Sequence, residues 1–403
     1  MSSGSTTPEP RTLQVRAGSV PMMTIERALA VEDLLVIDLR SPAEFAVDHL
    51  PGAHNVPLFG DVDRALIGLL YKQFSPSAAF AEGRAALAGR IEELTAEIAE
   101  LVGWELPRAD LRARLLAATE DGIEKLESAL EAQVTQSPPA RPVLLHCWRG
   151  GLRSRSVVSF LRGLGLDRAI GLTSGYKAWR RHALDTISAF DVEGPPRTPA
   201  FVLRGLTGVG KTLVLRELER QCPGWTFDLE AQAGHRSSLL GMVGLEPVSQ
   251  KGFETRIAQR LLAGFPGPVV FEGESRKVGD VVIPAPVWSA MKGALSIELT
   301  APTDVRVRVL SDDYMADESS WPKLREQLAA VEARMERRAP LVQLFDERRT
   351  DELVEVLLER YYDPLYRHSE SKYSYSTSID SSDPERAARE IAEWIRRRPR
   401  SST

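Results

Sequence analysis

Cysteine is scarce in this chain, which has only two among 403 residues. Cys147 and Cys222 lie far apart and in different predicted domains, so no structural disulfide is expected and a reducing compartment fits. Long apolar runs are missing as well, since no stretch approaches the roughly 20 residues that span a bilayer. The polar segment from Met1 to Pro10 lacks the apolar core of a signal peptide. These absences predict a cytoplasmic protein that does not enter a membrane.

Positive charge is also in short supply. The chain has 51 Lys and Arg against 56 Asp and Glu, a formal net charge of −5, which argues against a generally basic nucleic-acid-binding protein. Any RNA contact must therefore rest on local clusters of arginines. Two such clusters are Arg149, Arg153, Arg155, Arg162, Arg168, Arg180 and Arg181, and Arg334, Arg337 and Arg338. Each is either an RNA contact or an ordinary solvated face.

The length and composition suit two folded domains. A chain of 403 residues with 43% hydrophobic and 27% charged residues can bury two cores. No internal repeat is evident, and the proline-rich segment 191–199 favours neither a helix nor a central strand, so it marks a linker. We expect a first domain over 11–190, an α/β domain over 200–302, and a mainly helical region over 303–403 that completes the second half.

An insertion is predicted within the first domain, at about 78–134. Its apolar residues recur with helical spacing in two groups: Leu87, Ile91, Leu94, Ile98 and Leu101 on one face, and Ile123, Leu126 and Leu130 on another. The pattern predicts a helical hairpin. Because its charges are mostly acidic, a packed hairpin with a solvated face is favoured over a binding device.

The most informative stretch is 146–154, which reads HCWRGGLRS. It lies between a predicted strand, Pro142 to Leu145, and a predicted helix, so its glycine-rich turn can point backbone N–H groups at one spot above the Cys147 sulfur. Those N–H groups and the guanidiniums of Arg149 and Arg153 are expected to hold Cys147 as a thiolate, below the free pKa of about 8.5. The other residues of this predicted anion loop are Trp148, Gly150, Gly151, Leu152 and Ser154. The alternative is that Cys147 is a small buried hydrophobic residue.

A second motif follows the apolar strand Phe201 to Arg204. It reads GLTGVGKT and leads into the helical run Leu213 to Leu218, which is the strand, loop and helix context that a P-loop requires. Its backbone N–H groups would wrap a di- or triphosphate, Lys211 would add a point charge, and Thr212 is the expected ligand if Mg²⁺ is used. The predicted diphosphate-binding residues are Gly205, Thr207, Gly208, Val209, Gly210, Lys211 and Thr212.

A strand similar to a Walker B strand spans Pro268 to Glu272. Glu272 or Glu274 at its end would hold a metal ion or a water molecule, or simply cap a turn. No metal site is certain from the sequence.

Residues 36–57, VIDLRSPAEFAVDHLPGAHNVP, resemble the amino-terminal signature of rhodanese domains, which phosphotyrosine phosphatases with the same HC-x5-R-S string lack. Simple sulfurtransferases usually have one residue fewer between the cysteine and the arginine, so this loop should hold a bulkier anion such as phosphate or selenophosphate. Joined to a P-loop half, the chain resembles bacterial tRNA 2-selenouridine synthases. Further matching segments are Asp228-Leu229-Glu230, His235-Arg236, Gln250-Lys251-x-Phe253-Glu254, Glu274-Ser275-Arg276 and Tyr362-Asp363-Pro364-x-Tyr366.

The resemblance implies an α/β fold: a rhodanese-like parallel-sheet domain with a helical insertion, then a P-loop NTPase-like α/β domain and a helical C-terminal region. It also implies a transferase that acts on tRNA with 2-thiouridine at the wobble position. Such enzymes attach a geranyl group from geranyl diphosphate to the sulfur, and then exchange the S-geranyl group for selenium from selenophosphate. No tightly bound cofactor is expected, and the enzyme that produces selenophosphate is a candidate partner.

In these terms Cys147 would carry selenium as an S-selanylcysteine intermediate with the help of Arg153, and the P-loop would hold the diphosphate. The auxiliary candidates are Glu272, Glu274, Arg276, His235 and Arg236. Trp148, Tyr176 and Trp179 are either stacking platforms for a loop base or core residues.

Three alternatives stay open at this point. A phosphatase would use Cys147 and Arg153 without needing Lys211. A P-loop kinase with a rhodanese-like module would transfer phosphate from ATP, and a non-enzymatic tRNA-binding module would tolerate the loss of Cys147.

Overall fold

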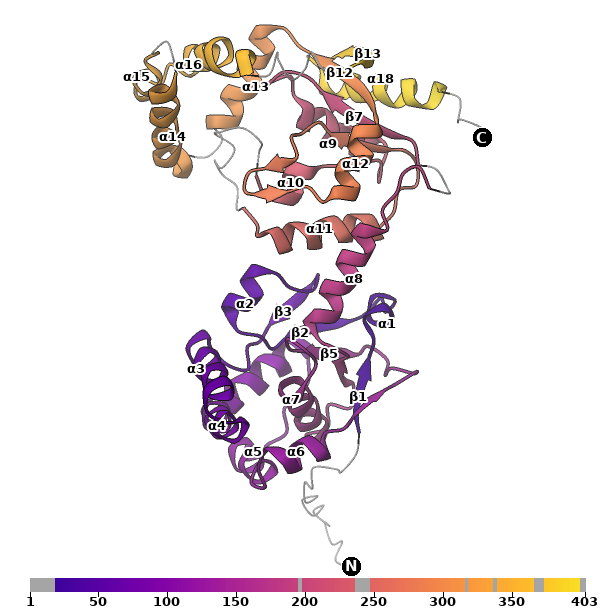
Figure 1. The fold of residues 1–403 in the computed structure, drawn as a ribbon, viewed down its shortest axis with the longest axis vertical. Coiled ribbons are helices and arrows are strands. Elements are labelled where there is room, and N and C mark those ends of the chain that lie inside the picture. The colour runs from indigo at the N-terminus through magenta and orange to yellow at the C-terminus, as the bar shows by residue number, and fades with distance from the viewer. Residues whose placement is uncertain are drawn as a thin grey trace, which may run out of the picture. The chain divides into compact units, whose positions relative to one another are not determined.

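The computed structural model describes residues 19–194, 198–235, 247–315, 318–335, 339–365 and 373–398. The chain divides into two compact units, Met1–Ala183 and Leu184–Thr403 (Figure 1). Each is an α/β unit built on a parallel sheet. Among the described helices, none combines the length and apolarity that a membrane crossing needs.

The division falls before the proline-rich segment, and described residues in and just before that segment pack within the second unit. Phe190 lies against Phe265, with ring centroids 6.2 Å apart. Val192 is buried, and its carbonyl accepts a hydrogen bond from the N–H of Thr198. These contacts show that Phe190 and Val192, which precede the prolines, pack with the second unit.

The first unit contains a six-stranded sheet in the order β3-β2-β5-β6-β1-β4, and every neighbouring pair is parallel. Its strands are β1 (Val20–Met23), β2 (Leu35–Asp38), β3 (Ala53–Asn55), β4 (Ala132–Val134), β5 (Val143–His146) and β6 (Ala169–Leu172). All four residues of β5 are buried, as expected for an inner parallel strand covered on both faces. The strand therefore delivers the next residue, Cys147, to the carboxyl edge of the sheet.

The helices of this unit are α1 (Ile25–Leu29), α2 (Pro42–Val47), α3 (Asp61–Gln73), α4 (Pro76–Val102), α5 (Leu111–Ala118), α6 (Ile123–Ala129) and α7 (Leu152–Gly163). Helix α8 (Tyr176–Ser188) begins in this unit and ends in the second. The predicted insertion over 78–134 is helical, but it is not a two-helix hairpin, because three helices, α4 to α6, occupy it and residues 132–134 form strand β4. Helix α3 has no buried residue.

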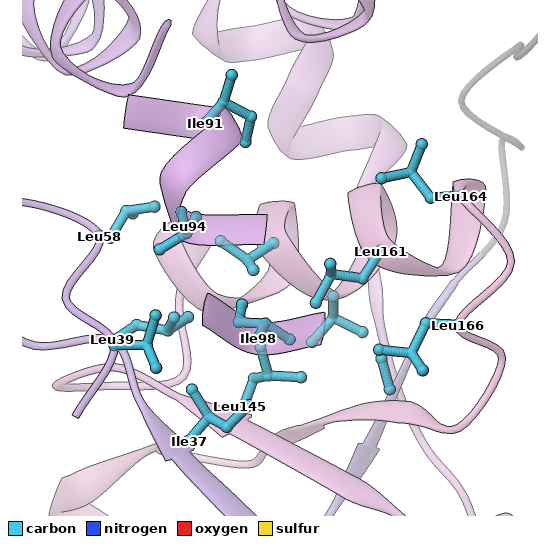
Figure 2. Close-up of a cluster of buried hydrophobic side chains, with 14 of the residues drawn as sticks. Ile37, Leu39, Leu58, Ile91, Leu94, Ile98, Leu145, Leu161, Leu164 and Leu166 are labelled. Carbon is cyan, nitrogen blue, oxygen red and sulfur yellow. The ribbon is translucent and has the colours of Figure 1, made fainter. Parts of the chain in front are cut away.

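Helix α4 supplies the central packing surface of the insertion. Figure 2 shows Ile91, Leu94 and Ile98 in one buried cluster with Leu145 of β5 and Leu161 of α7. The predicted stripe fails at its last position. Leu101 is 39% exposed, and the next residue, Val102, is buried instead. The helical repeat of 3.6 residues accounts for this, because the stripe drifts by one residue over a helix of this length.

The second unit holds a five-stranded parallel sheet in the order β13-β12-β7-β9-β8. Its strands are β7 (Ala200–Arg204), β8 (Thr226–Phe227), β9 (Val269–Glu272), β12 (Leu295–Thr300) and β13 (Tyr375–Asp380), and a separate antiparallel hairpin joins β10 (Lys277–Val278) to β11 (Val281–Val282). The helices around them are α9 (Lys211–Gln221), α10 (Leu229–Ala233), α11 (Gln250–Leu262), α12 (Ala285–Gly293) and α18 (Pro384–Arg397). Helices α9 and α18 share one core with β7 and β12. The P-loop strand β7 is thus central in the sheet.

The remaining helices form a cluster of their own, seen beside the sheet in Figure 1. They are α13 (Thr303–Met315), the short η1 (Glu318–Ser320), α14 (Trp321–Arg334), α15 (Leu341–Asp346), α16 (Thr350–Leu357) and the π-helical turn η2 (Leu358–Tyr362). After this cluster the chain returns to the sheet as β13 and α18.

Candidate functional site

Cys147 stands between the end of β5 and the start of α7, in the predicted strand, loop and helix context. Its side chain is 2% exposed, and its Sγ lies 3.3 Å from the hydroxyl of Ser154. Ser154 is in the first turn of α7, so the sulfur faces the amino end of a helix, where partial positive charge is concentrated.

Two opposing effects act on the Cys147 thiol. Burial raises its pKa, while the Arg153 charge, the Ser154 hydroxyl and the backbone N–H groups of Arg149 and Ser154 lower it. The net pKa lies below the ordinary value. Arg153 therefore acts through its charge, whereas Arg149 acts through its backbone and has an exposed side chain.

The loop is clamped by a turn that sequence reasoning missed. Gly175 has a φ of +56°, and a Cβ there would lie 2.2 Å from the Cys147 carbonyl oxygen and 2.5 Å from the Gly150 nitrogen. Gly150 has a φ of +63° and is equally crowded, since its Cβ would lie 2.4 Å from the Leu172 carbonyl oxygen. The N–H of Tyr176 donates to the Cys147 carbonyl at 2.9 Å. In the sequence, only the turn-forming residues Thr173-Ser174-Gly175 ahead of α8 could have indicated this contact.

Of the three candidate aromatic platforms, only Trp148 is partly exposed. Its ring lies 5.2 Å from that of Tyr176. Tyr176 and Trp179 are buried core residues, and the Tyr176 hydroxyl donates to Asp48 at 2.5 Å. Gly151 caps α7 and Leu152 begins it, so both lie in the loop as predicted.

Several arginines of the first cluster are structural. Arg155 donates to the Leu130 carbonyl at 2.7 Å, and Arg168 donates to the Val102 carbonyl at 2.6 Å. Arg162 bonds the carbonyls of Asp167 and Ala169. These guanidiniums fasten loops and the insertion to the unit. Of the second cluster, Arg337 and Arg338 lie outside the described residues.

The P-loop in the second unit has the backbone conformation its glycines permit. Gly205, Gly208 and Gly210 have φ angles of +144°, +82° and +79°. A Cβ at Gly205 would lie 2.4 Å from the Leu299 carbonyl oxygen. The Lys211 Nζ donates to the Gly205 carbonyl at 3.2 Å, so the ammonium lies over the loop.

Two side chains from later parts of the chain, Arg306 and Ser381, donate hydrogen bonds to carbonyl groups of the P-loop. Arg306 of α13 donates through Nε to the Thr207 carbonyl at 2.9 Å, and its guanidinium pairs with both carboxylate oxygens of Asp363. The Ser381 hydroxyl donates to the Val209 carbonyl at 2.7 Å. Asp363 belongs to the Tyr-Asp-Pro segment, whose contribution to this site no short-range pattern indicates.

Carboxylates gather beside the P-loop at the end of β9. The Thr212 hydroxyl donates to Glu272 at 2.6 Å, and carboxylate oxygens of Glu230, Glu272 and Glu274 lie within 4.8 Å of one another. Burial, joined by the charges of Glu230, Asp228 and Glu274, raises the pKa of Glu272 well above its usual value. Its second carboxylate oxygen has no hydrogen-bond partner among the described residues. Hard oxygen donors in this arrangement fit Mg²⁺.

The other auxiliary candidates lie farther along the same edge. His235 is buried, and its ring packs on Gly279 of the β10–β11 turn, because a Cβ there would lie 2.5 Å from the ring. Arg276 is exposed and precedes β10. Arg236 and Tyr366 lie outside the described residues.

Comparison with known proteins places the chain among tRNA-modifying enzymes. A family model described as "tRNA 2-selenouridine synthase AAA domain" matches residues 198–339. The chain is 30% identical over 386 residues to the tRNA 2-selenouridine synthase of Chromohalobacter salexigens, across 89% of this chain and 93% of that protein. It is 31% identical over 372 residues to the protein of the same name from Cupriavidus necator, across 84% and 89%. Among solved structures, a gluconokinase from Sinorhizobium meliloti 1021 aligns with a TM-score of 0.22 and 16% identity, covering 49% of this chain and 94% of that one.

Proposed function

The chain belongs to the tRNA 2-selenouridine synthase family, and from that premise we propose that it converts wobble 2-thiouridine in tRNA to 2-selenouridine through an S-geranyl intermediate. The observation that carries the proposal is the pairing of two anion sites in one chain. A thiol with a lowered pKa lies in one unit and a P-loop in the other. Two successive reactions with two phosphorus-containing donors would use both.

The first reaction is assigned to the P-loop. The bond from C1 of the geranyl group to the diphosphate oxygen breaks, diphosphate leaves with the electron pair, and C1 bonds to the sulfur of the base, whose N3 proton is lost. Lys211 and the loop N–H groups would stabilise the charge that develops on the leaving diphosphate. Thr212, Glu230, Glu272 and Glu274 are the residues that would hold Mg²⁺, which would neutralise part of the same charge.

The second reaction is assigned to the Cys147 loop. Arg153 and the loop N–H groups would hold the tetrahedral anion of selenophosphate. Selenium then bonds to C2 of the base, the C2–S bond breaks, and the geranyl thiolate leaves and takes up a proton.

Cys147 would serve as the carrier of selenium. Its thiolate forms an S–Se bond while the Se–P bond of selenophosphate breaks, and that electron pair leaves with phosphorus as phosphite. The terminal selenium of the resulting S-selanylcysteine then bonds to C2 as the geranyl thiolate leaves. A free thiol, supplied with the substrates as the reductant, attacks the Cys147 sulfur, so the S–Se bond breaks and its electron pair stays on selenium as the selenocarbonyl of the base. A second thiol reduces the mixed disulfide and restores Cys147. A lowered pKa suits this role, because the thiolate is the nucleophilic form of cysteine.

The test is to incubate the purified protein with tRNA containing 2-thiouridine and to analyse the nucleosides by mass spectrometry. Geranyl diphosphate alone should yield S-geranyl-2-thiouridine, and geranyl diphosphate with selenophosphate should yield 2-selenouridine without ATP. A requirement for ATP hydrolysis would favour a P-loop kinase, and release of phosphate from aryl phosphates would favour a phosphatase. If the protein bound tRNA but formed no modified nucleoside, the non-enzymatic tRNA-binding module would be the remaining alternative.

A further inference from the structure

A large cavity adjoins Cys147 within the first unit. Its volume is about 840 Å³, within the range of about 300–1,000 Å³ that is typical of small-ligand sites. Cys147, Arg149 and Arg153 line one end of it. The same cavity extends over helix α3 and over helices α4, α5 and α6 of the insertion, so the Cys147 loop and these helices line one space.

The second part is lined mainly by apolar side chains. Ile67 of α3, Phe80 and Leu87 of α4, and Leu126 of α6 are among them. Ile67, Phe80 and Leu87 pack against the core without being fully buried. Apolar surface left accessible in a concave site is the usual mark of an apolar ligand.

Two of the charged side chains along this wall, Arg64 and Arg84, have partners within the protein. Arg84 donates to the Thr119 hydroxyl at 2.8 Å and to the Leu116 carbonyl at 2.9 Å. Arg64 donates to Glu44 at 3.0 Å. Both guanidiniums are thus held against the protein, while the charge of Arg153 acts on the Cys147 thiol at its end of the cavity.

We propose that this cavity holds the geranyl chain of S-geranyl-2-thiouridine while selenium replaces sulfur at C2, an inference that rests on the proposed function. The reacting carbon must lie at the Cys147 end, where Arg153 would hold the selenium donor. The ten-carbon chain is attached to the sulfur on that same carbon, so it must lie in the adjoining space. As the C2–Se bond forms and the C2–S bond breaks, the geranyl thiolate leaves into the apolar cavity and is protonated there.

The insertion therefore gains a role beyond packing. It supplies the surface that distinguishes an alkylated base from unmodified 2-thiouridine, because only the alkylated base can bury a chain there. Selenation would then follow geranylation by recognition of the leaving group.

Gly83 of α4 offers a direct test, because a Cβ there would lie 3.4 Å from the Phe59 ring and 3.6 Å from Ile67 Cδ1, at the cavity wall. Gly83→Leu would place a branched side chain in the space of the ligand. Gly89→Leu is the matched control, since Gly89 lies on the same helix and a Cβ there meets nothing within 4 Å. The substrates are tRNAs carrying S-geranyl- or S-methyl-2-thiouridine, each supplied with selenophosphate.

Gly83→Leu should lower kcat/KM for the S-geranyl substrate by about tenfold or more, as misfitting methylenes in an apolar pocket do. The S-methyl substrate, geranylation of 2-thiouridine, and the Gly89→Leu variant should be unaffected. Ile67→Ala, which enlarges the cavity, should shift preference from S-geranyl towards S-farnesyl.

An unchanged order of chain-length preference in both cavity variants would overturn the inference. Loss of geranylation with intact selenation of S-geranyl tRNA would also overturn it, because the cavity would then hold the free donor. If the wild-type protein failed to selenate S-geranyl tRNA, the proposed function itself would fall, and this inference with it.

Discussion

The protonation of Cys147 depends on a balance that single residues can shift. Burial alone would favour the neutral thiol, yet Arg153, Ser154 and two backbone N–H groups bring the pKa below its ordinary value. A thiol with a lowered pKa stays ionised down to a lower pH, so its reactivity should persist there and fall only as the pH drops through that pKa.

Arg153→Lys should raise the pKa of Cys147, because an ammonium cannot reproduce the planar fork that serves the thiolate and a bound anion together. Arg149→Ala should leave the pKa unchanged, since Arg149 acts through its backbone N–H and its side chain is exposed. The measurement is the pH dependence of Cys147 alkylation, followed on its own peptide so that Cys222 does not contribute. Equal shifts in the two variants would contradict this assignment.

For single residues, the short motifs predicted which side chains lie together, whereas the positions of isolated arginines did not predict their partners. The spacing from Cys147 to Arg153 and Ser154 indicated which groups meet, because one short turn connects them. Arg155 and Arg168 were grouped with RNA-binding candidates, but they bond carbonyls that distant segments bring near. Only the folded chain determines such partners.

Among the elements, the turn ahead of α8 is as important to the thiol as the loop that contains it. Gly175→Ala should disturb the loop, because its Cβ would overlap the Cys147 carbonyl oxygen and the Gly150 nitrogen. Gly103→Ala is the control, with a φ of +62° and nothing within 4 Å of its Cβ. Each change should cost about 1 kcal/mol of stability for the left-handed backbone, measured by denaturant unfolding. Only Gly175→Ala should also raise the Cys147 pKa, and a similar shift in Gly103→Ala would refute the clamp.

The P-loop depends in the same way on α13 and the segment after η2. Asp363→Asn should leave the Arg306 charge without its carboxylate and cost about 3 kcal/mol of stability, because both side chains are largely buried. Asp346→Asn removes the partner of Arg325 at an exposed site, where solvent screens the pair, so it should leave stability almost unchanged. Chemical denaturation measures both. Titration with geranyl diphosphate should show weaker binding in Asp363→Asn alone, and equal losses in the two variants would contradict a positioning role.

The elements that the sequence predicted are fully buried short strands and helices with one buried face. Strands β5, β7 and β9 and helices α7 and α9 were all expected, since a short apolar run or a single stripe indicates them. Helix α3 and strand β4 were not predicted, and neither contains a buried residue. Pairing of β4 with β1, more than a hundred residues earlier, is a long-range contact that local pattern does not encode.

The molecule as a whole joins two α/β units, each with a glycine-containing loop between an inner strand and a helix. Family membership and the P-loop were recognisable from motifs, because a few residues at fixed spacing determine the chemistry. The cavity beside Cys147 was not, because its lining comes from four separate parts of the chain.

Lys211→Ala should reduce geranylation about 100-fold or more, in line with the ~3 kcal/mol that a positioned charge stabiliser contributes. Selenation of tRNA that already carries the S-geranyl group should continue at the wild-type rate, because that step uses the other unit. The two rates are measured separately on the two tRNA substrates. Unchanged geranylation would move the diphosphate away from the P-loop.

The most direct test of the central claim, a division of work between the two loops, is the nucleoside content of tRNA treated with Cys147→Ser. With 2-thiouridine tRNA, geranyl diphosphate and selenophosphate, this variant should accumulate S-geranyl-2-thiouridine and form no 2-selenouridine, because serine cannot carry selenium as a thiolate does. Formation of 2-selenouridine at the wild-type yield would contradict the covalent role of Cys147.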